Sequence, residues 1–289
     1  MQSIVTYMMP DLLKASDQRL LRVSRSGSKD AFEVLWQRHA AAQLAVIRGI
    51  PTLIDTGEIL GIARRRSLAL IAGGADPQAS VRAFFALTAQ SVARDQARIP
   101  GPPQAVQGDV QKPEPPAPQR SSLVGAYFSL SRQRRELLWY HDVELLGATE
   151  CARYTGTPAS LVSNRVKSDR KSLWQAWIKE ELGSGRNLST GCREFLKQSR
   201  RYSENRLGLR HYETALRHVG GCTRCLVLAG HAERVHERLA TLLPHAVFGE
   251  NAKAYRDWID QGTPAPRHLD LDQHSTKARL DSSTFRERI

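Results

Sequence analysis

Three cysteines and one histidine in the C-terminal third of the chain have the types and spacing of metal ligands. Cys192 is followed by His218, which stands four positions before Cys222, and Cys222 forms a CxxC pair with Cys225. Thiolate sulfur and imidazole nitrogen are ligands that Zn²⁺ prefers, and four of them complete a closed tetrahedral site. The pattern therefore predicts a structural or redox-sensing Zn²⁺. A closed site leaves no position for an activated water, which argues against a zinc hydrolase.

Helical spacing explains how these ligands can meet. Residues four apart share one helix face, so a single helix can present His218 towards Cys222 before the chain turns at Gly220-Gly221. Cys225 would then lie near the start of the next helix, where the helix dipole favours a thiolate. Two alternatives stay open. The cysteines could pack as small apolar residues with His218 solvated, or the CxxC pair could be a catalytic dithiol, although no strand-helix-strand pattern surrounds it.

Upstream of these ligands, the segment 130–173 is predicted to form three short helices. Apolar residues recur at helical intervals in the first helix, Gly147 opens the second, and Gly156 ends it. Thr157-Pro158 then starts the third helix, because proline suits the first helical turn. The residues of the third helix that we expect to face the core are Leu161, Val162 and Val166.

Two helices joined through a glycine, with a polar and basic outer face on the second, are typical of a helix-turn-helix. A three-helix packing unit whose charges are merely solvated is the alternative. In a helix-turn-helix the last helix lies in the major groove, where its side chains read base edges and phosphates. The residues predicted nearest the base edges are Ser160, Ser163, Asn164 and Lys167, and those predicted on phosphates or within the domain are Arg165 and Arg170.

The N-terminal part of the chain is predicted to form four helices. Two lie within residues 17–49 and meet at a turn at Gly27-Ser28, the third spans 54–72 after a proline, and the fourth spans about 77–98. Residues 100–120 are rich in proline and glutamine without apolar periodicity. We expect them to form an extended linker that holds the flanking helical units apart and leaves their orientation free.

Two parts of the chain resemble regions two and four of bacterial sigma factors of the extracytoplasmic-function type. The matching residues are Asp17 to Arg22, Gly27, Ala31-Phe32, Leu35-Trp36 and Arg38-His39 for region two, and Leu130, Arg132, Gln133, Arg134, Glu136, Glu150-Cys151-Ala152, Gly156, Val162, Arg165 and Arg170 for region four. The resemblance implies an all-α transcription initiation factor that binds core RNA polymerase and recognises the −35 element of promoter DNA. It also implies that Glu58, Ile59 and Leu60 contact the polymerase. We expect no catalytic activity.

The chain departs from this family at several positions. Ser131 stands where proline is usual, and Ile62 and Arg64 stand where the third helix of region two usually has an acid and an aromatic residue. The fourth helix is also poor in aromatic side chains that could stack on bases, because Phe84 and Phe85 are expected in the core. The alternative function is therefore a degenerate sigma-like regulator that binds polymerase or another sigma factor without opening promoters.

The metal-ligand segment resembles a zinc-binding anti-sigma domain, on the residues Cys192-Arg193, 218–225 and Leu242-Leu243-Pro244. In some actinobacterial sigma factors such a domain is fused behind region four. The resemblance implies a small helical bundle that docks on a sigma domain and modulates it, and in some members thiol oxidation ejects the metal. It also allows a separate anti-sigma protein or another regulator as a further partner.

Length and charge agree with several units and a polyanionic partner. The 289 residues carry a net charge of +13, which favours nucleic acid over a membrane surface because no apolar run is long enough to cross a bilayer. We expect a cytoplasmic protein, in which reduced cysteines favour metal binding over disulfides. The expected units are a region-two-like domain (1–99), a linker (100–120), a region-four-like helix-turn-helix domain (121–183), a zinc-binding domain (188–245) and a flexible tail (246–289) with one amphipathic helix near 254–259.

Overall fold

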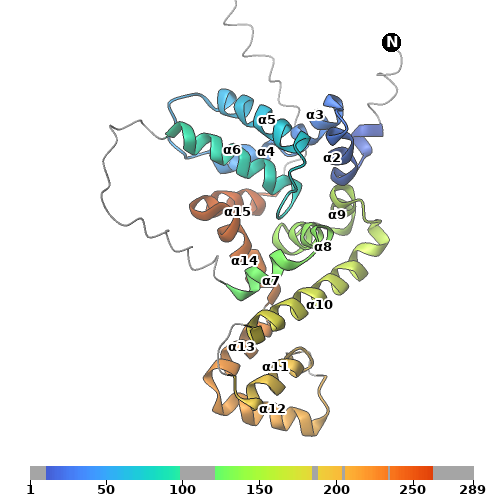
Figure 1. Ribbon diagram of the computed structural model, residues 1–289, viewed down its shortest axis with the longest axis vertical. Coiled ribbons are helices and arrows are strands. Elements are labelled where there is room, and N and C mark those ends of the chain that lie inside the picture. The colour runs from blue at the N-terminus through green and yellow to red at the C-terminus, as the bar shows by residue number, and fades with distance from the viewer. Residues whose placement is uncertain (1–10, 98–120, 184–187, 204–205, 234, 263–289) are drawn as a thin grey trace, which may run out of the picture.

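The computed structural model describes residues 11–97, 121–183, 188–203, 206–233 and 235–262. All regular secondary structure in these ranges is helical, which confirms the all-α prediction (Figure 1). None of the described helices combines the length and the apolar character that crossing a membrane requires. The predicted linker at 100–120 lies outside the described residues.

The N-terminal unit includes the helices α2 (Asp17–Arg25), α3 (Lys29–Arg38), α4 (Ala40–Ile47), α5 (Thr56–Ala72) and α6 (Val81–Ala97). Residues 11–14, which precede them, are also helical. Side chains cap several of them, since Ser28 accepts a hydrogen bond from the backbone N–H of Ala31 and Asp55 accepts one from Glu58. The second helix expected within residues 17–49 is divided into α3 and α4 at His39, a fully buried residue whose ring is held by polar partners on both sides.

The second unit contains the helices for which a helix-turn-helix was predicted. It comprises α7 (Ser122–Ser129), α8 (Arg132–Leu138), the π-helix η2 (Trp139–Val143), α9 (Ala148–Thr155) and α10 (Ala159–Gly183). Helix α9 ends at Gly156, whose φ of 75° is the left-handed conformation that glycine adopts without strain. Helix α10 is much longer than the recognition segment and extends to the next group of helices (Figure 1).

That group is the predicted metal-binding unit, made of α11 (Thr190–Ser203), α12 (Leu209–Gly221) and α13 (Thr223–Glu233). It contacts the C-terminal end of α10 and lies away from the N-terminal unit (Figure 1). Its core is small and includes Phe195, Leu196, Val219 and Leu228. A unit of this size buries little apolar surface, so a metal ion would add substantially to its stability.

The chain then returns to the first two units through α14 (Val235–Phe248), the short 3₁₀ helix η3 (Gly249–Asn251) and α15 (Ala252–Asp260). The expectation of a flexible tail from residue 246 is wrong for residues 246–260. Phe248 and Tyr255 are buried, Gln90 donates a hydrogen bond to the carbonyl of Phe248 (2.9 Å), and Asn251 donates one to the carbonyl of Val46 (2.8 Å). The remaining residues from 263 lie outside the described part of the chain.

The first two units share one continuous core with these C-terminal helices, which differs from the expectation that a linker holds the units apart. Buried apolar side chains from Leu12 to Tyr255 form a single cluster. Polar contacts also cross between the units, because Tyr140 donates to Asp17 (3.2 Å) and Gln18 donates to Glu136 (3.2 Å). In Figure 1, α15 lies beneath α4 and α6 and above α14.

Gly156 is a point of close approach between the units. A Cβ at this position would lie 2.9 Å from Oγ of Ser16, the residue that caps α2. We expect Gly156→Ala to lower the free energy of unfolding by more than the ~1–2 kcal/mol that the left-handed conformation alone costs. Gly74→Ala is the matched control, because Gly74 also has a positive φ but a Cβ there meets nothing within 4 Å. Urea unfolding of both variants measures the difference, and equal losses would contradict the close contact.

Candidate functional site

The four predicted metal ligands come together in the metal-binding unit. The ligand atoms of Cys192, His218, Cys222 and Cys225 all lie within 4.8 Å of one another. Sγ of Cys192 is 3.7 Å from Sγ of Cys222, and Nε2 of His218 is 3.2 Å from Sγ of Cys225. The cluster can therefore hold a metal ion, as the spacing predicted.

These separations are compatible with zinc. Two thiolates on a tetrahedral Zn²⁺ with bonds of ~2.3 Å lie about 3.8 Å apart, and a thiolate and an imidazole nitrogen lie about 3.6 Å apart. The observed 3.7 Å between Cys192 and Cys222 matches the first value, and the 3.2 Å between His218 and Cys225 is slightly shorter than the second. Three sulfurs and one nitrogen also form a donor set that suits Zn²⁺ better than Mg²⁺ or Ca²⁺.

Each ligand is placed by a different part of the fold. Cys192 lies in the first turn of α11, His218 in the last turn of α12, Cys222 directly after α12, and Cys225 in the first turn of α13. Ser189 accepts a hydrogen bond from the backbone N–H of Cys192 and donates one to its sulfur (3.2 Å each), and this bond lowers the pKa of the Cys192 thiol. Burial raises the pKa of Cys225. The turn was predicted at Gly220-Gly221, but both glycines belong to α12 and the helix ends one residue later, at Cys222, whose backbone is extended.

Gly191 leaves the space that the His218 ring occupies. A Cβ on Gly191 would lie 2.8 Å from Nδ1 and 3.0 Å from Cε1 of His218. Gly191 thus lies against the edge of the imidazole formed by Nδ1 and Cε1, while Nε2 faces Cys225. Phe195, one turn further along α11, contacts the same ring at 6.1 Å between centroids.

We expect Gly191→Ala to weaken zinc binding about tenfold, because the new methyl group displaces His218 and changes to the surroundings of a ligand typically cost 10–100-fold. Competition with a chromophoric chelator measures the affinity. Gly230→Ala in α13 is the matched control, since a Cβ there meets nothing within 4 Å. Unchanged zinc affinity in Gly191→Ala would contradict a role for His218 in holding the metal.

The predicted DNA-contact residues lie together on the N-terminal part of α10. Ser160, Ser163, Asn164, Arg165 and Lys167 are exposed. Their side chains stand opposite a buried stripe of the same helix, whose members are Val162, Val166, Asp169, Leu173 and Trp177. The exposed face of α10 is thus polar and basic, as the sequence predicted.

Two arginines and one leucine of this helix have different surroundings. Arg170 binds both carboxylate oxygens of buried Asp142 (2.5 and 3.1 Å), so it holds α10 against η2, in agreement with a position within the domain. Arg165 is half exposed and pairs with Asp169 at 3.6 Å. Leu161 was expected in the core, but its side chain is 52% exposed. Adjacent helical positions differ by about 100°, and Val162 and Val166 already form the buried stripe.

The three residues assigned to polymerase contact differ in exposure. Glu58 is exposed in the first turn of α5, whereas Ile59 and Leu60 are buried in the core at 2% and 6% exposure. Ile59 and Leu60 therefore pack in the core at this end of α5. Of the three, only Glu58 offers its side chain to a partner in the described arrangement.

Sequence reasoning missed a buried polar network that joins the first two units to α15. We define this network as Asp17, Arg38, His39, Arg82, Glu144 and Tyr255. Asp17 accepts from Arg38 (2.7 Å) and His39 (2.8 Å), while Glu144 accepts from Arg82, from Tyr255 (2.7 Å) and from Trp139 (2.6 Å). The residues lie far apart in sequence, so no local pattern could have revealed their contacts.

Arg82 and His39 have defined protonation states in this network. An arginine only donates, so Nδ1 of His39 accepts from Arg82 (3.3 Å) and Nε2 carries the proton that binds Asp17. Burial lowers the pKa of His39, which keeps the ring neutral. Burial alone would lower the pKa of Arg82, but Glu144 raises it above its ordinary value. Arg82 therefore remains charged beside Glu144, and its guanidinium also lies 4.5 Å from the ring centre of Tyr154.

The metal-binding unit contacts α10 through one of the two residues between its CxxC cysteines. Arg224 lies 3.5 Å from Glu181 of α10, and Glu181 also accepts a hydrogen bond from Ser122 of α7 (2.5 Å). Trp177 of α10 donates to the same serine at 3.0 Å. The unit that contains the four candidate metal ligands thus contacts the helix whose other end carries the predicted DNA-contact face.

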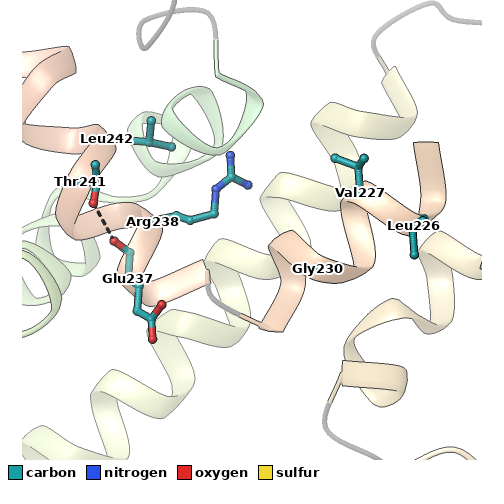
Figure 2. A pocket seen from close by; sticks show the side chains of 7 residues that line it. All are labelled: Leu226, Val227, Gly230, Glu237, Arg238, Thr241 and Leu242. Atoms are coloured by element: carbon teal, nitrogen blue, oxygen red, sulfur yellow. Dashed lines mark hydrogen bonds between the residues drawn. The ribbon is translucent and has the colours of Figure 1, made fainter. Parts of the chain in front are cut away.

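A groove of about 570 Å³ lies between α13 and α14 (Figure 2). Leu226, Val227 and Leu242 provide its apolar lining, and Arg238 extends from α14 into the space between the helices. Burial lowers the pKa of Arg238. The groove contains none of the four metal ligands, so it is distinct from the metal centre.

Comparison of the chain with family models, with curated proteins and with solved structures finds no match.

Proposed function

We propose that this protein is a sigma-factor-like transcription initiation factor that binds core RNA polymerase and promoter DNA and carries a fused zinc-binding unit. The observation that carries the proposal is the exposed face of α10. Ser160, Ser163, Asn164 and Lys167 have no side-chain hydrogen-bond partner among the described residues, and they follow a glycine turn after α9. Such a face can enter a major groove and read base edges, which supports recognition of a −35-like element.

Charge supports the same partner. The chain has a net charge of +13, and Lys167 and Lys171 extend the positive charge along the exposed side of α10. Positive side chains that replace the counterions of DNA phosphates provide most of the sequence-independent affinity. Zn²⁺ in the four-ligand cluster would then act as a structural ion, because four protein ligands leave no open position.

The C-terminal helices suggest how the fused unit modulates the protein. Helices α14 and α15 pack against both sigma-like units, and Tyr255 joins the buried polar network between them. A factor that contacts two promoter elements needs its two units separated by the length of the spacer. We therefore propose that the described arrangement is a closed form, which polymerase or DNA must open.

One observation favours the alternative of a regulator that binds polymerase or another sigma factor without opening promoters. Phe85 is fully buried and Arg82 is 2% exposed, so these groups of α6 are unable to stack on bases or to bind phosphates in the described arrangement. Arg64, which stands at a position usually occupied by another residue type in the family, pairs with Glu33 at 2.6 Å.

Reconstitution distinguishes the two functions. The zinc-loaded chain is combined with core RNA polymerase and genomic fragments, and specific transcripts are mapped. Transcripts that depend on the chain support the initiation factor, whereas binding to polymerase without transcripts supports the regulator. Binding to neither polymerase nor DNA would contradict both.

A pair of lysines tests the role of α10 in this assay. We expect Lys167→Ala to weaken binding to promoter-containing duplexes several-fold. The slope of log K against log salt concentration should also become less steep by about one, as the loss of one contact to DNA predicts. Lys179→Ala is the control, since Lys179 is also exposed but lies near the C-terminal end of α10. Fluorescence anisotropy across a salt series measures both values. Equal effects of the two substitutions would show that DNA does not bind specifically at the N-terminal part of α10.

A further inference from the structure

Leu161 is an exposed apolar side chain on an otherwise polar surface. It is the third residue of α10 and is 52% exposed, whereas its neighbour Val162 is fully buried. Asn164 and Arg165 lie one turn further along the same exposed side of the helix, at positions i+3 and i+4. The DNA-contact face proposed above therefore contains one hydrophobic group among its hydrogen-bonding groups.

The position of this group matches a specific feature of DNA. Residues near the N-terminus of a recognition helix are the ones that contact base edges. In the major groove, thymine presents a C5-methyl group that no other standard base carries, and proteins recognise it by apolar contact. A serine, asparagine or lysine at this position would offer no comparable contact, and the side chain of Leu161 is free to be covered.

We infer that Leu161 determines sequence specificity by packing against the 5-methyl group of a thymine in the bound duplex. This inference rests on the proposed DNA-binding function and adds to it the identity of one base. The rest of the face is available for hydrogen bonds, and Asn164 stands one turn away from Leu161. The contact buries the thymine methyl group and part of the leucine side chain, which is exposed in the described arrangement.

Deoxyuridine provides the direct test, because it differs from thymidine only by the missing methyl group. High-affinity duplexes are first selected from a randomised double-stranded DNA library with the full zinc-loaded chain. Each thymidine of a selected duplex is then replaced by deoxyuridine in turn, and the dissociation constant is measured by fluorescence anisotropy. We expect one replacement to weaken binding about fourfold, the effect of one buried methyl group.

The variant Leu161→Ala identifies the protein side of the contact. It should bind the thymidine and deoxyuridine duplexes with nearly equal affinity, because alanine lacks the branched end of the leucine side chain that reaches the thymine methyl group. Leu209→Ala is the matched control, since Leu209 is 75% exposed on α12, and this variant should retain the fourfold preference. Circular dichroism verifies that each variant is folded, which the exposure of both leucines leads us to expect.

Three results would overturn the inference, and they differ in what they say about the proposed function. If a duplex is selected but no thymidine shows a methyl effect, DNA binding stands and the thymine contact is wrong. If the methyl effect persists in Leu161→Ala, another residue makes the contact. If no duplex is selected and the chain binds no DNA, the proposed function fails together with the inference.

Discussion

Cys225→Ser is expected to abolish zinc binding and to unfold the metal-binding unit, α11 to α13. Cys225 is fully buried, and its sulfur faces Nε2 of His218 at 3.2 Å. Serine provides no thiolate, so the cluster would fall to three ligands. The free energy of zinc binding is folding free energy in such units and amounts to about 10–16 kcal/mol in zinc-finger peptides. The small apolar core of α11 to α13 is unable to replace this contribution.

Two measurements detect the loss of zinc and the unfolding of α11 to α13. Elemental analysis of the purified chain should fall from about one zinc ion per molecule to none, as expected for one closed four-ligand site. Hydrogen exchange should become rapid in α11 to α13 and remain slow in α3 and α6, which belong to the N-terminal unit and lie away from the metal-binding unit (Figure 1). This regional difference distinguishes local unfolding from collapse of the whole protein.

Cys151→Ser is the matched control for the same chemical change. Cys151 is also a buried thiol, but it lies in α9 of the helix-turn-helix and is not part of the metal cluster. Its substitution should leave the zinc content unchanged. Retention of stoichiometric zinc by Cys225→Ser would contradict the four-ligand site, and loss of zinc from Cys151→Ser would place a ligand where the structure has none.

The metal cluster could be predicted from the sequence because most of its information is local. His218, Cys222 and Cys225 lie within eight residues, so the end of one helix and the start of the next are enough to bring them together. Cys192 is more distant in the sequence, and only its residue type indicated that it is the fourth ligand. The break between α9 and α10 was predictable for a similar reason, since Gly156 and the following Thr157-Pro158 mark a helix end and a helix start.

The position of Leu161 shows a limit of periodicity. Two adjacent apolar residues both fit a helical pattern, but only one can face the core, and the stripe through Val162 and Val166 decides in favour of Val162. The stripe also includes Asp169, a buried acid that interrupts the apolar pattern and pairs with Arg134 and Arg165. A count of apolar positions alone would have ended the stripe too early.

The packing of the C-terminal helices could not be predicted because their partners are distant in sequence. A short amphipathic helix near residues 254–259 was expected, and α15 confirms it. Its partners were hidden, since Tyr255 binds Glu144 and Asn251 binds the carbonyl of Val46. Arg82 illustrates the same limit, because a charged residue normally indicates a surface, and here Glu144 and three aromatic rings enclose it.

Breaking the Arg82–Glu144 pair should destabilise the protein strongly. Both side chains are buried, at 3% exposure for Arg82 and 0% for Glu144. We expect Arg82→Met and Glu144→Gln each to lower the free energy of unfolding by about 3–5 kcal/mol, because each leaves an uncompensated charge in the interior. The double variant removes both charges, so its loss should be much smaller than the sum of the two single losses. Urea unfolding of the four proteins gives the coupling energy.

A solvent-exposed ion pair is the control for these losses of stability. Arg66 and Asp95 are separated by 3.1 Å, but both side chains are about half exposed. Solvent screening limits such a pair to ~1 kcal/mol or less, so Arg66→Met should change stability little. Losses in Arg82→Met and Glu144→Gln that are no larger than this would show that the pair is not buried in solution.

The same cycle tests whether the network keeps the units together. Arg82 belongs to the N-terminal unit, Glu144 follows η2, and Tyr255 on α15 binds Glu144, so one substitution acts on three segments at once. In Glu144→Gln we expect small-angle scattering to report a larger radius of gyration under conditions where circular dichroism still reports native helix content. Loss of helix in parallel with expansion would instead mean that the units depend on the contact for folding. If the Glu144→Gln protein keeps the native radius of gyration and the native stability, the buried polar network does not hold the units together.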